Sequence, residues 1–158
     1  MQIMGIGGGF RNNIGELRGG HIAFCESPTE FASRTGYVAL LPRTRLDNAR
    51  FFMTEGETRN EQGRIHRGGV DVTEEVVARV PRGALTMGVS TILNAKKCLQ
   101  VAYGQHKAEI LVASIEGEVT PNIPASFLQK HTNVVILLDK DAASKLTLEP
   151  VWKKTEHA

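Results

Sequence analysis

The sequence has few cysteines, few aromatic residues and no large excess of either charge. Cys25 and Cys98 are the two cysteines among 158 residues. Two are too few for the disulfide framework of a small secreted domain, so the cytoplasm is the expected compartment. Lys and Arg number 19 and Asp and Glu number 17, a formal net charge of +2, which argues against a nucleic-acid binder with a concentrated basic face. No apolar run approaches the roughly 18 residues of a membrane span, and the start of the chain lacks the pattern of a secretory signal.

Common signatures of nucleotide and metal chemistry are also absent. There is no G-x-x-x-x-G-K-[ST] phosphate loop, and Phe10 occupies the third glycine position of a G-x-G-x-x-G pattern that begins at Gly5. The other histidines are scattered along the chain: His66, His106, His131 and His157. None of them lies in an H-E-x-x-H or H-x-x-E-H sequence. We therefore expect no metal site. The Gly-rich start is typical either of a tight turn or of a ligand-binding loop at a strand end.

The sequence does contain an alternation of strands and helices. Apolar residues make up 41% and charged residues 23% of the chain, which is typical of a folded domain. The pattern predicts strands at 2–6, 37–41, 98–103 and 133–139, and helices at 43–52, 73–80, 90–97, 104–116 and 124–130. This alternation indicates an α/β fold with a mainly parallel sheet.

Individual segments carry more detailed expectations. Strand 133–139 is expected to be apolar on both faces, and residues 84–87 to be buried. The helix at 90–97 is expected to begin at a Ser or Thr cap. Residues 5–20 contain seven glycines and are expected to form a loop, and residues 53–71 a long loop or insertion.

A small set of side chains could support chemistry. His21 with the nearby Glu26 could form an acid/base pair near neutral pH, the alternative being a surface His and an unrelated Glu. Lys107 is expected in the first turn of a helix that follows a strand, where ammonium and helix N-terminus would face an anion. Arg50 is a second candidate cation, although both could simply be solvated. Cys25 could be a nucleophile, but a small buried residue is the simpler interpretation.

Seven sequence segments contain these candidate residues and their surroundings, and their order along the chain is informative. The segments are GHIAFCE (20–26), ASRT (32–35), RLDNARFF (45–52), ALTMGVSTIL (84–93), YGQHKAEIL (103–111), EGEVTPNIPASFLQKH (116–131) and VVILLD (134–139). Together they resemble the carboxyl-terminal half of the glucosamine-6-phosphate deaminases, also called isomerases. The resemblance covers the chain from residue 2 to about residue 140. The 6-phosphogluconolactonases share the superfamily, but the H-I-A-F-x-E segment favours the deaminases.

The resemblance implies an incomplete modified Rossmann-like α/β fold, with a mainly parallel sheet and flanking helices. It also implies conversion of glucosamine 6-phosphate and water to fructose 6-phosphate and ammonia by acid/base chemistry, without a cofactor. Carried over by motif, His21 opens the sugar ring with Glu26 as its carboxylate partner, and Arg50 and Lys107 bind the substrate phosphate. The expected partner is a small phosphosugar, with a homo-oligomer as a further option and no nucleic acid or membrane.

The sequence departs from the family pattern in several places. The family motif G-x-G-x-D-G-H has an Asp two residues before the His, where this chain has Gly19. We expect a domain over residues 1–150 with insertions at 10–19 and 54–72, followed by a tail at 151–158. The amino-terminal half, which supplies the first strands and the Asp that abstracts the C2 proton, is missing from the matched pattern. A sheet cut there would expose a strand edge and apolar surface and promote aggregation.

Three functions remain open on this basis. The first is an enzyme of the deaminase family. The second is a catalytically degenerate sugar-phosphate-binding relative or a truncated gene product, which the absent motif Asp favours. The third is a 6-phosphogluconolactonase-like hydrolase, which needs only a His base and a phosphate site.

Overall fold

The computed structural model describes residues 1–53 and 74–148, which divide into two compact units. The first unit comprises Met1–Gly36 and the described residues from Thr86 onward, and the second comprises Tyr37–Leu85. The insertion expected at 54–72 and the tail expected at 151–158 lie outside the described residues. Among the helices described, none has the length and apolar character needed to cross a membrane.

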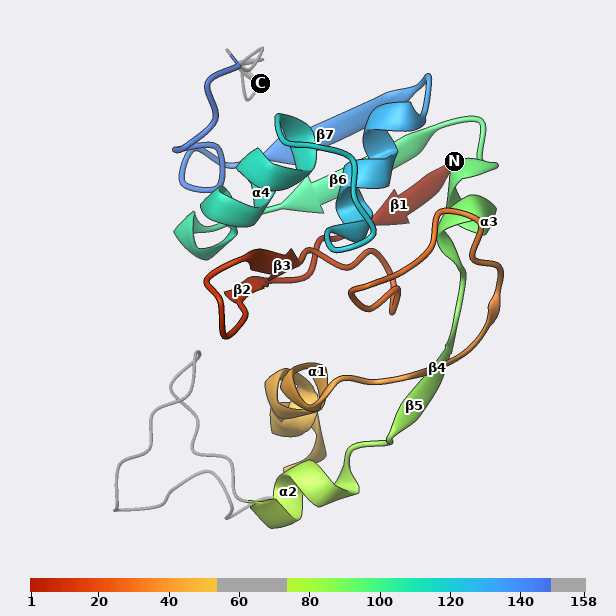
Figure 1. Cartoon of the computed structure of the whole chain (residues 1–158), viewed down its shortest axis with the longest axis vertical. Helices are drawn as coiled ribbons and strands as arrows, with labels where there is room; N and C mark the ends of the chain where they lie inside the picture. The colour runs from red at the N-terminus through yellow and green to blue at the C-terminus, as the bar shows by residue number, and fades with distance from the viewer. Residues whose placement is uncertain (54–73, 149–158) are drawn as a thin grey trace, which may run out of the picture. The chain divides into compact units, whose positions relative to one another are not determined.

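The first unit is built on a parallel sheet of three strands in the order β1-β6-β7 (Figure 1). The strands are β1 at Gln2–Met4, β6 at Cys98–Ala102 and β7 at Val134–Leu138. The register places Met4 beside Gln100 and Val101 beside Leu137. The α/β fold and the parallel sheet expected from the sequence are therefore confirmed.

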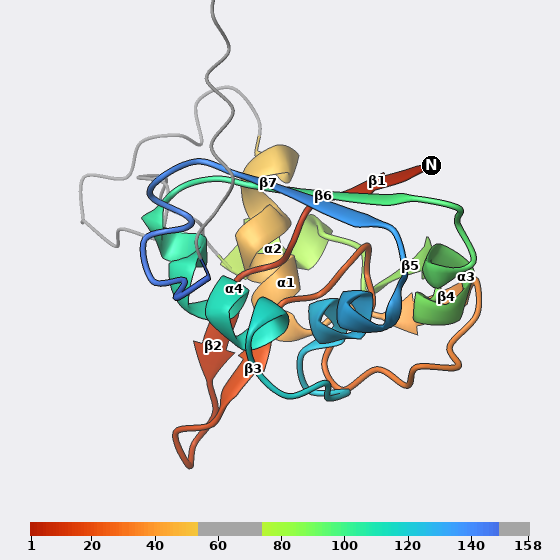
Figure 2. The same cartoon turned by 90° about the horizontal axis from the view of Figure 1, so that it is seen from above.

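Helices cover one face of this sheet. α4 (Ala108–Ile115) and the 3-10 helix η3 (Pro124–Lys130) lie on the same side of the strands (Figure 2). The core of the unit forms between these helices and the sheet, and its most buried members include Ile22, Cys98, Ile110, Leu111 and Phe127. Each such large apolar side chain stabilises the fold by about 1.5–3 kcal/mol. This one-sided core fixes the positions of β1, β6 and α4.

Residues 9–19 form a β-hairpin, so the expectation of a plain loop over residues 5–20 was wrong. β2 (Gly9–Arg11) pairs antiparallel with β3 (Leu17–Gly19). The Oδ1 atom of Asn12 accepts hydrogen bonds from the backbone N–H groups of Ile14 (3.1 Å) and Glu16 (2.9 Å). These bonds specify a tight turn, which Asn favours because its side chain can bond to nearby backbone.

Helix α3 (Val89–Leu93) is shorter than the helix expected at 90–97 and lacks the expected Ser or Thr cap. Its N-cap residue is Gly88, and the Val89 N–H donates to the Oγ atom of Ser33 (2.8 Å). Before residue 97 the chain has already left the helix, and the Lys97 carbonyl, directly before β6, accepts the Gln2 N–H at 2.9 Å. The cap therefore comes from a distant Ser, which a local pattern does not predict.

Apart from its end residues Gly36 and Thr86, a two-stranded sheet lies in the second unit together with three short helical segments. These elements are β4 (Gly36–Ala39), α1 (Pro42–Asn48), η1 (Ala49–Phe52), α2 (Glu74–Arg79) and β5 (Gly83–Thr86). The small core of this unit consists of Ala49, Val76 and Val80. The Arg45 guanidinium donates to the carbonyl oxygens of Val77 (2.8 Å) and Val80 (3.1 Å), which satisfies acceptors at the end of α2.

Two expectations about burial were wrong. Leu85, in the stretch expected to be buried, is 79% exposed. Strand β7 was expected to be buried on both faces, but its burial alternates, and Leu137 is 52% exposed. The reason is the one-sided cover of the sheet: α4 and η3 pack against alternate residues of each strand, and the residues between them point away.

The core predicts a stability contrast between two isoleucines. Ile110 is 1% exposed in α4, whereas Ile14 is 80% exposed in the hairpin turn. Ile110→Ala should lower the free energy of unfolding by about 2–5 kcal/mol, because it leaves a cavity. Ile14→Ala should change it by less than about 0.5 kcal/mol. Urea unfolding followed by circular dichroism measures both, and equal losses would contradict the one-sided core.

Candidate functional site

The carboxyl ends of the three parallel strands meet at one edge of the sheet, which is where open α/β sheets bind ligands. β1 leads into the Gly5–Gly8 segment, β6 into the turn before the 3-10 helix η2 (Gln105–Lys107), and β7 into Asp139. Both carboxylate oxygens of Asp139 accept the Gly104 N–H, at 2.9 and 3.0 Å. Asp139 thereby holds the start of η2 against the end of β7.

Lys107 reaches from the start of α4 to the end of β1. Its ammonium donates to the carbonyl oxygen of Ile6 at 2.8 Å. An ammonium has three donors, and this bond uses one of them to orient the Lys107 side chain. Lys107 is also the N-cap residue of α4. A cation at a helix N-terminus is an arrangement that favours an anionic group.

His21 packs against the same segment of β1. A Cβ atom added to Gly7 would lie 2.0 Å from the His21 Cδ2 atom and 2.3 Å from Nε2, so the ring occupies space that only a glycine leaves open. The Gly7 N–H also donates to the His21 carbonyl at 2.8 Å. Lys107 therefore bonds to Ile6 and His21 packs against the next residue, Gly7, so the two predicted site residues contact adjacent positions after β1.

The orientation of the His21 ring is set by a backbone group. The Nδ1 atom lies 2.6 Å from the carbonyl oxygen of Ala23. Because a carbonyl can only accept, this bond places a hydrogen on Nδ1 and, in the neutral ring, leaves the lone pair on Nε2. Ala23 has φ of +49°, a conformation that costs a non-glycine residue roughly 1 kcal/mol or more. The neutral ring is thus prepared to accept a proton at Nε2.

Glu26 lies five positions after His21 in the chain, and its pairing with the His21 ring stays a prediction. The Glu26 N–H donates to the Phe24 carbonyl at 2.9 Å, and its carbonyl accepts the Thr29 hydroxyl. Its side chain is half-buried. These backbone bonds hold Glu26 in a tight turn that begins at the buried Ile22.

Cys25 is packed into the core, which favours the simpler of its two interpretations. It is 2% exposed, and its thiol donates to the Met87 carbonyl, with an Sγ–O distance of 3.2 Å. Burial, and to a lesser degree the charge of Glu26, raises the pKa of Cys25 to about 11. A thiol with this pKa is almost fully protonated near neutral pH, and the thiolate is the nucleophilic form. Cys25 therefore positions the loop that carries His21 and Glu26.

Arg50 belongs to η1 in the second unit, so the first unit contains His21 and Lys107 but not the second predicted cation. The role of Arg50 as a phosphate ligand stays a prediction. The sequence supports it through the RLDNARFF segment alone.

Gly19 occupies the position where the family motif has an Asp, and its backbone conformation is one that favours glycine. Gly19 has φ of +100°, and a Cβ atom there would lie 2.5 Å from the carbonyl oxygen of Gly8. An Asp could not occupy this backbone without moving the hairpin. The hairpin at 9–19 and the loss of the Asp are therefore compatible parts of one local structure.

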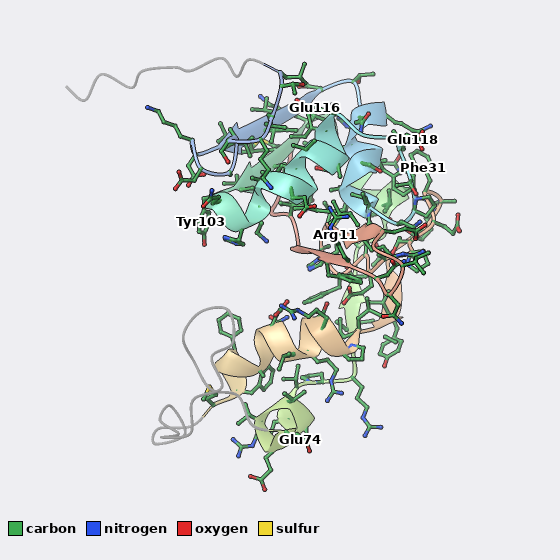
Figure 3. The ribbon with its side chains drawn as sticks, turned by 60° about the vertical axis from the view of Figure 1, so that its left-hand side comes forward. Arg11, Phe31, Glu74, Tyr103, Glu116 and Glu118 are labelled. Atoms are coloured by element: carbon green, nitrogen blue, oxygen red, sulfur yellow. The ribbon has the colours of Figure 1, made fainter. Side chains whose placement is uncertain are left out.

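Sequence reasoning missed one residue of this edge. Asp139 directly follows the apolar run of β7, and a polar residue at the end of a buried strand is a signal for the carboxyl edge of a parallel sheet. Exposed Tyr103 lies at the same end of the sheet, after β6 and beside α4 (Figure 3). Within residues 1–53 and 74–148, no group of three or more His, Cys, Asp or Glu side chains is placed to hold a metal ion.

The chain is similar to several curated bacterial proteins. It is 38% identical over 146 residues to glucosamine-6-phosphate deaminase of Clostridium novyi, covering 92% of this chain and 47% of that protein. It is 40% identical over 147 residues to the deaminase of Lacticaseibacillus paracasei, covering 93% and 49%. The match to the deaminase of Shewanella halifaxensis is 38% over 156 residues, covering 99% and 47%. The chain thus spans about half the length of these relatives. No protein-family model matches it.

Solved structures agree with these relatives. A monomeric glucosamine-6-phosphate deaminase of the NagB superfamily superposes with a TM-score of 0.68 at 36% identity, covering 92% of this chain and 47% of that one. A 6-phosphogluconolactonase from Trypanosoma cruzi superposes with a TM-score of 0.52 at 18% identity, covering 92% and 40%. The second likeness shows a shared fold alone. The resemblance found in the sequence is confirmed.

The contact between Gly7 and His21 predicts that a methyl group added at position 7 disturbs the His21 ring. Gly7→Ala should displace the His21 ring and shift its imidazole NMR signals. Gly8→Ala is the matched control, since a Cβ atom there meets nothing within 4 Å. The signals of His131, whose Nε2 lies 2.6 Å from the Ala95 carbonyl, should stay unchanged in both variants. Equal shifts of the His21 signals in the two variants would contradict the packing.

The burial of Cys25 predicts slow labelling of its thiol. With a pKa of about 11 against the ordinary 9.0, the thiolate is roughly 100-fold scarcer at pH 8. A Cys98→Ser variant leaves Cys25 as the single thiol. Maleimide at pH 8 should then label the folded chain at least about 100-fold more slowly than the urea-unfolded chain. Equally fast labelling of both would restore Cys25 as a candidate nucleophile.

Proposed function

Because the chain is homologous to about half of a glucosamine-6-phosphate deaminase, we propose that it carries the ring-opening and phosphate-binding part of such an enzyme. The proposed overall reaction converts glucosamine 6-phosphate and water into fructose 6-phosphate and ammonia. The observation that supports this most is that Lys107 bonds to Ile6 and His21 packs against the adjacent Gly7, in the segment that follows β1.

The first proposed step is opening of the sugar ring. The Nε2 lone pair of His21 takes the proton from the hydroxyl on C1, the ring oxygen leaves C1, and that oxygen regains a proton. This step needs a base that titrates near neutral pH, which an imidazole provides. The Ala23 carbonyl at Nδ1 holds the ring so that Nε2 is the basic atom. We propose Glu26 as the carboxylate that stabilises the protonated ring.

The phosphate group is the proposed partner of the cations. Lys107 would contribute its ammonium charge at the start of α4, and Arg50 would contribute a guanidinium from η1. Binding the phosphate fixes the sugar relative to His21, and this ordering lowers the barrier for every later step. The transfer of a proton from C2 to C1 and the loss of the amine as ammonia follow on the opened chain, without a cofactor in this proposal.

The test is ammonia release from glucosamine 6-phosphate by the purified chain and by His21→Ala. Loss of a positioned acid/base group should lower kcat by about 100-fold or more. His131→Ala is the control, because its ring bonds to the Ala95 carbonyl in another part of the same unit. Turnover that survives in His21→Ala would overturn the assignment of the base.

A second outcome identifies the alternative function. If the chain binds glucosamine 6-phosphate but releases no ammonia, and Lys107→Met abolishes that binding, the chain is a degenerate sugar-phosphate-binding relative. Gly19, at the position of the family's motif Asp, is the feature of this chain that supports this outcome. Release of acid from 6-phosphogluconolactone instead would identify the lactonase-like alternative.

A further inference from the structure

A polar side chain of β6 is buried in the core of the first unit with an incomplete set of hydrogen bonds. Gln100 is 1% exposed, and its side-chain Nε2 atom has no hydrogen-bond partner among the described residues. Buried polar groups are nearly always hydrogen-bonded, because a donor that has lost water and gained no acceptor destabilises the fold. Gln100 therefore needs an acceptor that the described part of the chain does not supply.

The Gln100 side chain lines a cavity of about 280 Å³ between the sheet and the helices that cover it. One wall of this cavity comes from β6 and β7, and the other comes from α4 and η3 (Figure 2). Most of the lining is apolar and includes Ile115, Leu128, Val134 and Ile136. Because an apolar cavity of roughly 150 Å³ already holds a benzene-sized molecule, this cavity has room for a small organic ligand.

A second buried polar side chain in the cavity has the opposite hydrogen-bonding role. Ser114 of α4 is 3% exposed, and its hydroxyl donates to the Leu111 carbonyl at 3.1 Å. That bond uses the single hydrogen of the hydroxyl, so Ser114 can offer only lone pairs to a ligand, whereas Gln100 Nε2 can offer only hydrogens. A hydroxyl group on the ligand suits both side chains, because it accepts from one and donates to the other.

The cavity suits a ligand without charge. Its lining residues, within the part of the chain that the structure describes, include no Asp, Glu, Lys or Arg. His131 is in the wall, and backbone groups occupy both of its ring nitrogens. Its Nε2 atom lies 2.6 Å from the Ala95 carbonyl oxygen, and its Nδ1 atom accepts the Asn133 N–H at 3.0 Å. An ionic group in this cavity would lose its hydration without gaining an opposite charge.

The rim of the cavity lies at the end of η3. Gln129 and Thr132 are exposed members of the wall, whereas the polar side chains inside are buried. The Gln129 Nε2 atom donates to the carbonyl oxygens of Ser114 and Gly117, both at 3.0 Å, and these bonds hold η3 against the end of α4. A ligand can therefore enter at this rim with its hydroxyl directed inward.

We propose that this cavity binds a small uncharged alcohol. The hydroxyl of the alcohol accepts a hydrogen bond from Gln100 Nε2, and its apolar body packs against Leu128 and Ile136. The cavity is separate from the candidate site described above, because Ser114 lies about 10 Å along α4 from Lys107 at the N-cap of that helix. Binding here is therefore a further function of the first unit, independent of the proposed deaminase reaction.

The experiment titrates cyclohexanol into the isotope-labelled chain and follows the side-chain NMR signals. The Gln100 amide protons and the methyl groups of Leu128 and Ile136 should shift in a saturable manner, because these side chains line the cavity. Cyclohexanecarboxylate has a similar size but carries a charge, and it should bind this cavity at least about ten-fold more weakly.

The variant Gln100→Leu removes the donor and keeps a side chain of similar size. It should lower the preference for cyclohexanol over methylcyclohexane at least about ten-fold, because the hydroxyl loses its partner inside the cavity. Gln2→Leu is the matched control. The Gln2 amide lies outside the cavity and donates to the Ile3 carbonyl, so this variant should leave the preference unchanged.

Nuclear Overhauser effects in the unaltered chain give a second measurement, which holds even if Gln100→Leu fails to fold. The Gln100 amide protons should contact the proton on C1 of the bound alcohol, next to its hydroxyl. The proposal would be overturned by a lack of saturable binding or by equal affinity for the carboxylate. Gln100 amide contacts with water alone or with C4 of the ring, or an unchanged preference in Gln100→Leu, would overturn it as well.

Discussion

The parallel pairing of β1 with β6 is the contact on which the rest of the first unit depends. It joins residues nearly one hundred positions apart, from Gln2 beside Cys98 to Met4 beside Gln100. Because the strands are parallel, their carboxyl ends lie at the same edge, and the loops that follow them must meet there. The Lys107 bond to the Ile6 carbonyl is possible only because β1 and β6 end side by side. The backbone hydrogen bonds between β1 and β6 thus determine which loops meet at the candidate site.

Glycine at this edge serves packing more directly than it serves phosphate binding. Gly7 leaves room for the His21 ring, and Gly19 allows the hairpin to pass the Gly8 carbonyl. Neither position requires a bound anion to explain it. By composition the Gly-rich start of the chain could have been a phosphate loop. In the structure, the absence of a side chain at Gly7 leaves the space that the His21 ring occupies. The cation proposed for the phosphate is instead Lys107, in the βα connection that follows β6.

The sequence was most informative where a segment's structure depends on its own residues. The apolar runs of β6 and β7 predicted those strands to within one residue at each end, and the helix expected at 124–130 matches the bounds of η3. The helix expected at 104–116 contains α4, which begins later because residues 105–107 form the 3-10 helix η2. The motif resemblance selected His21 and Lys107, and the structure places them against the adjacent residues Gly7 and Ile6; their roles stay predictions.

What could not be predicted depends on distant partners. The cap of α3 is Ser33, the partner of His21 Nδ1 is a carbonyl whose direction follows from φ of +49° at Ala23, and Asp139 acts on Gly104 from another strand. No local pattern encodes these three contacts. The hairpin was missed for a related reason: its glycines hid the alternation of β2 and β3 that would have identified two strands.

The apolar pattern of β7 shows how an incorrect local prediction can still carry information. Val135 and Leu137 have the character of residues that are buried, and they are exposed in this structure. A strand that is solvated on one face has no physical reason to be apolar on that face, because alternation with polar residues would keep the protein from associating. The sequence therefore matches a sheet covered on both sides, and the described residues cover one.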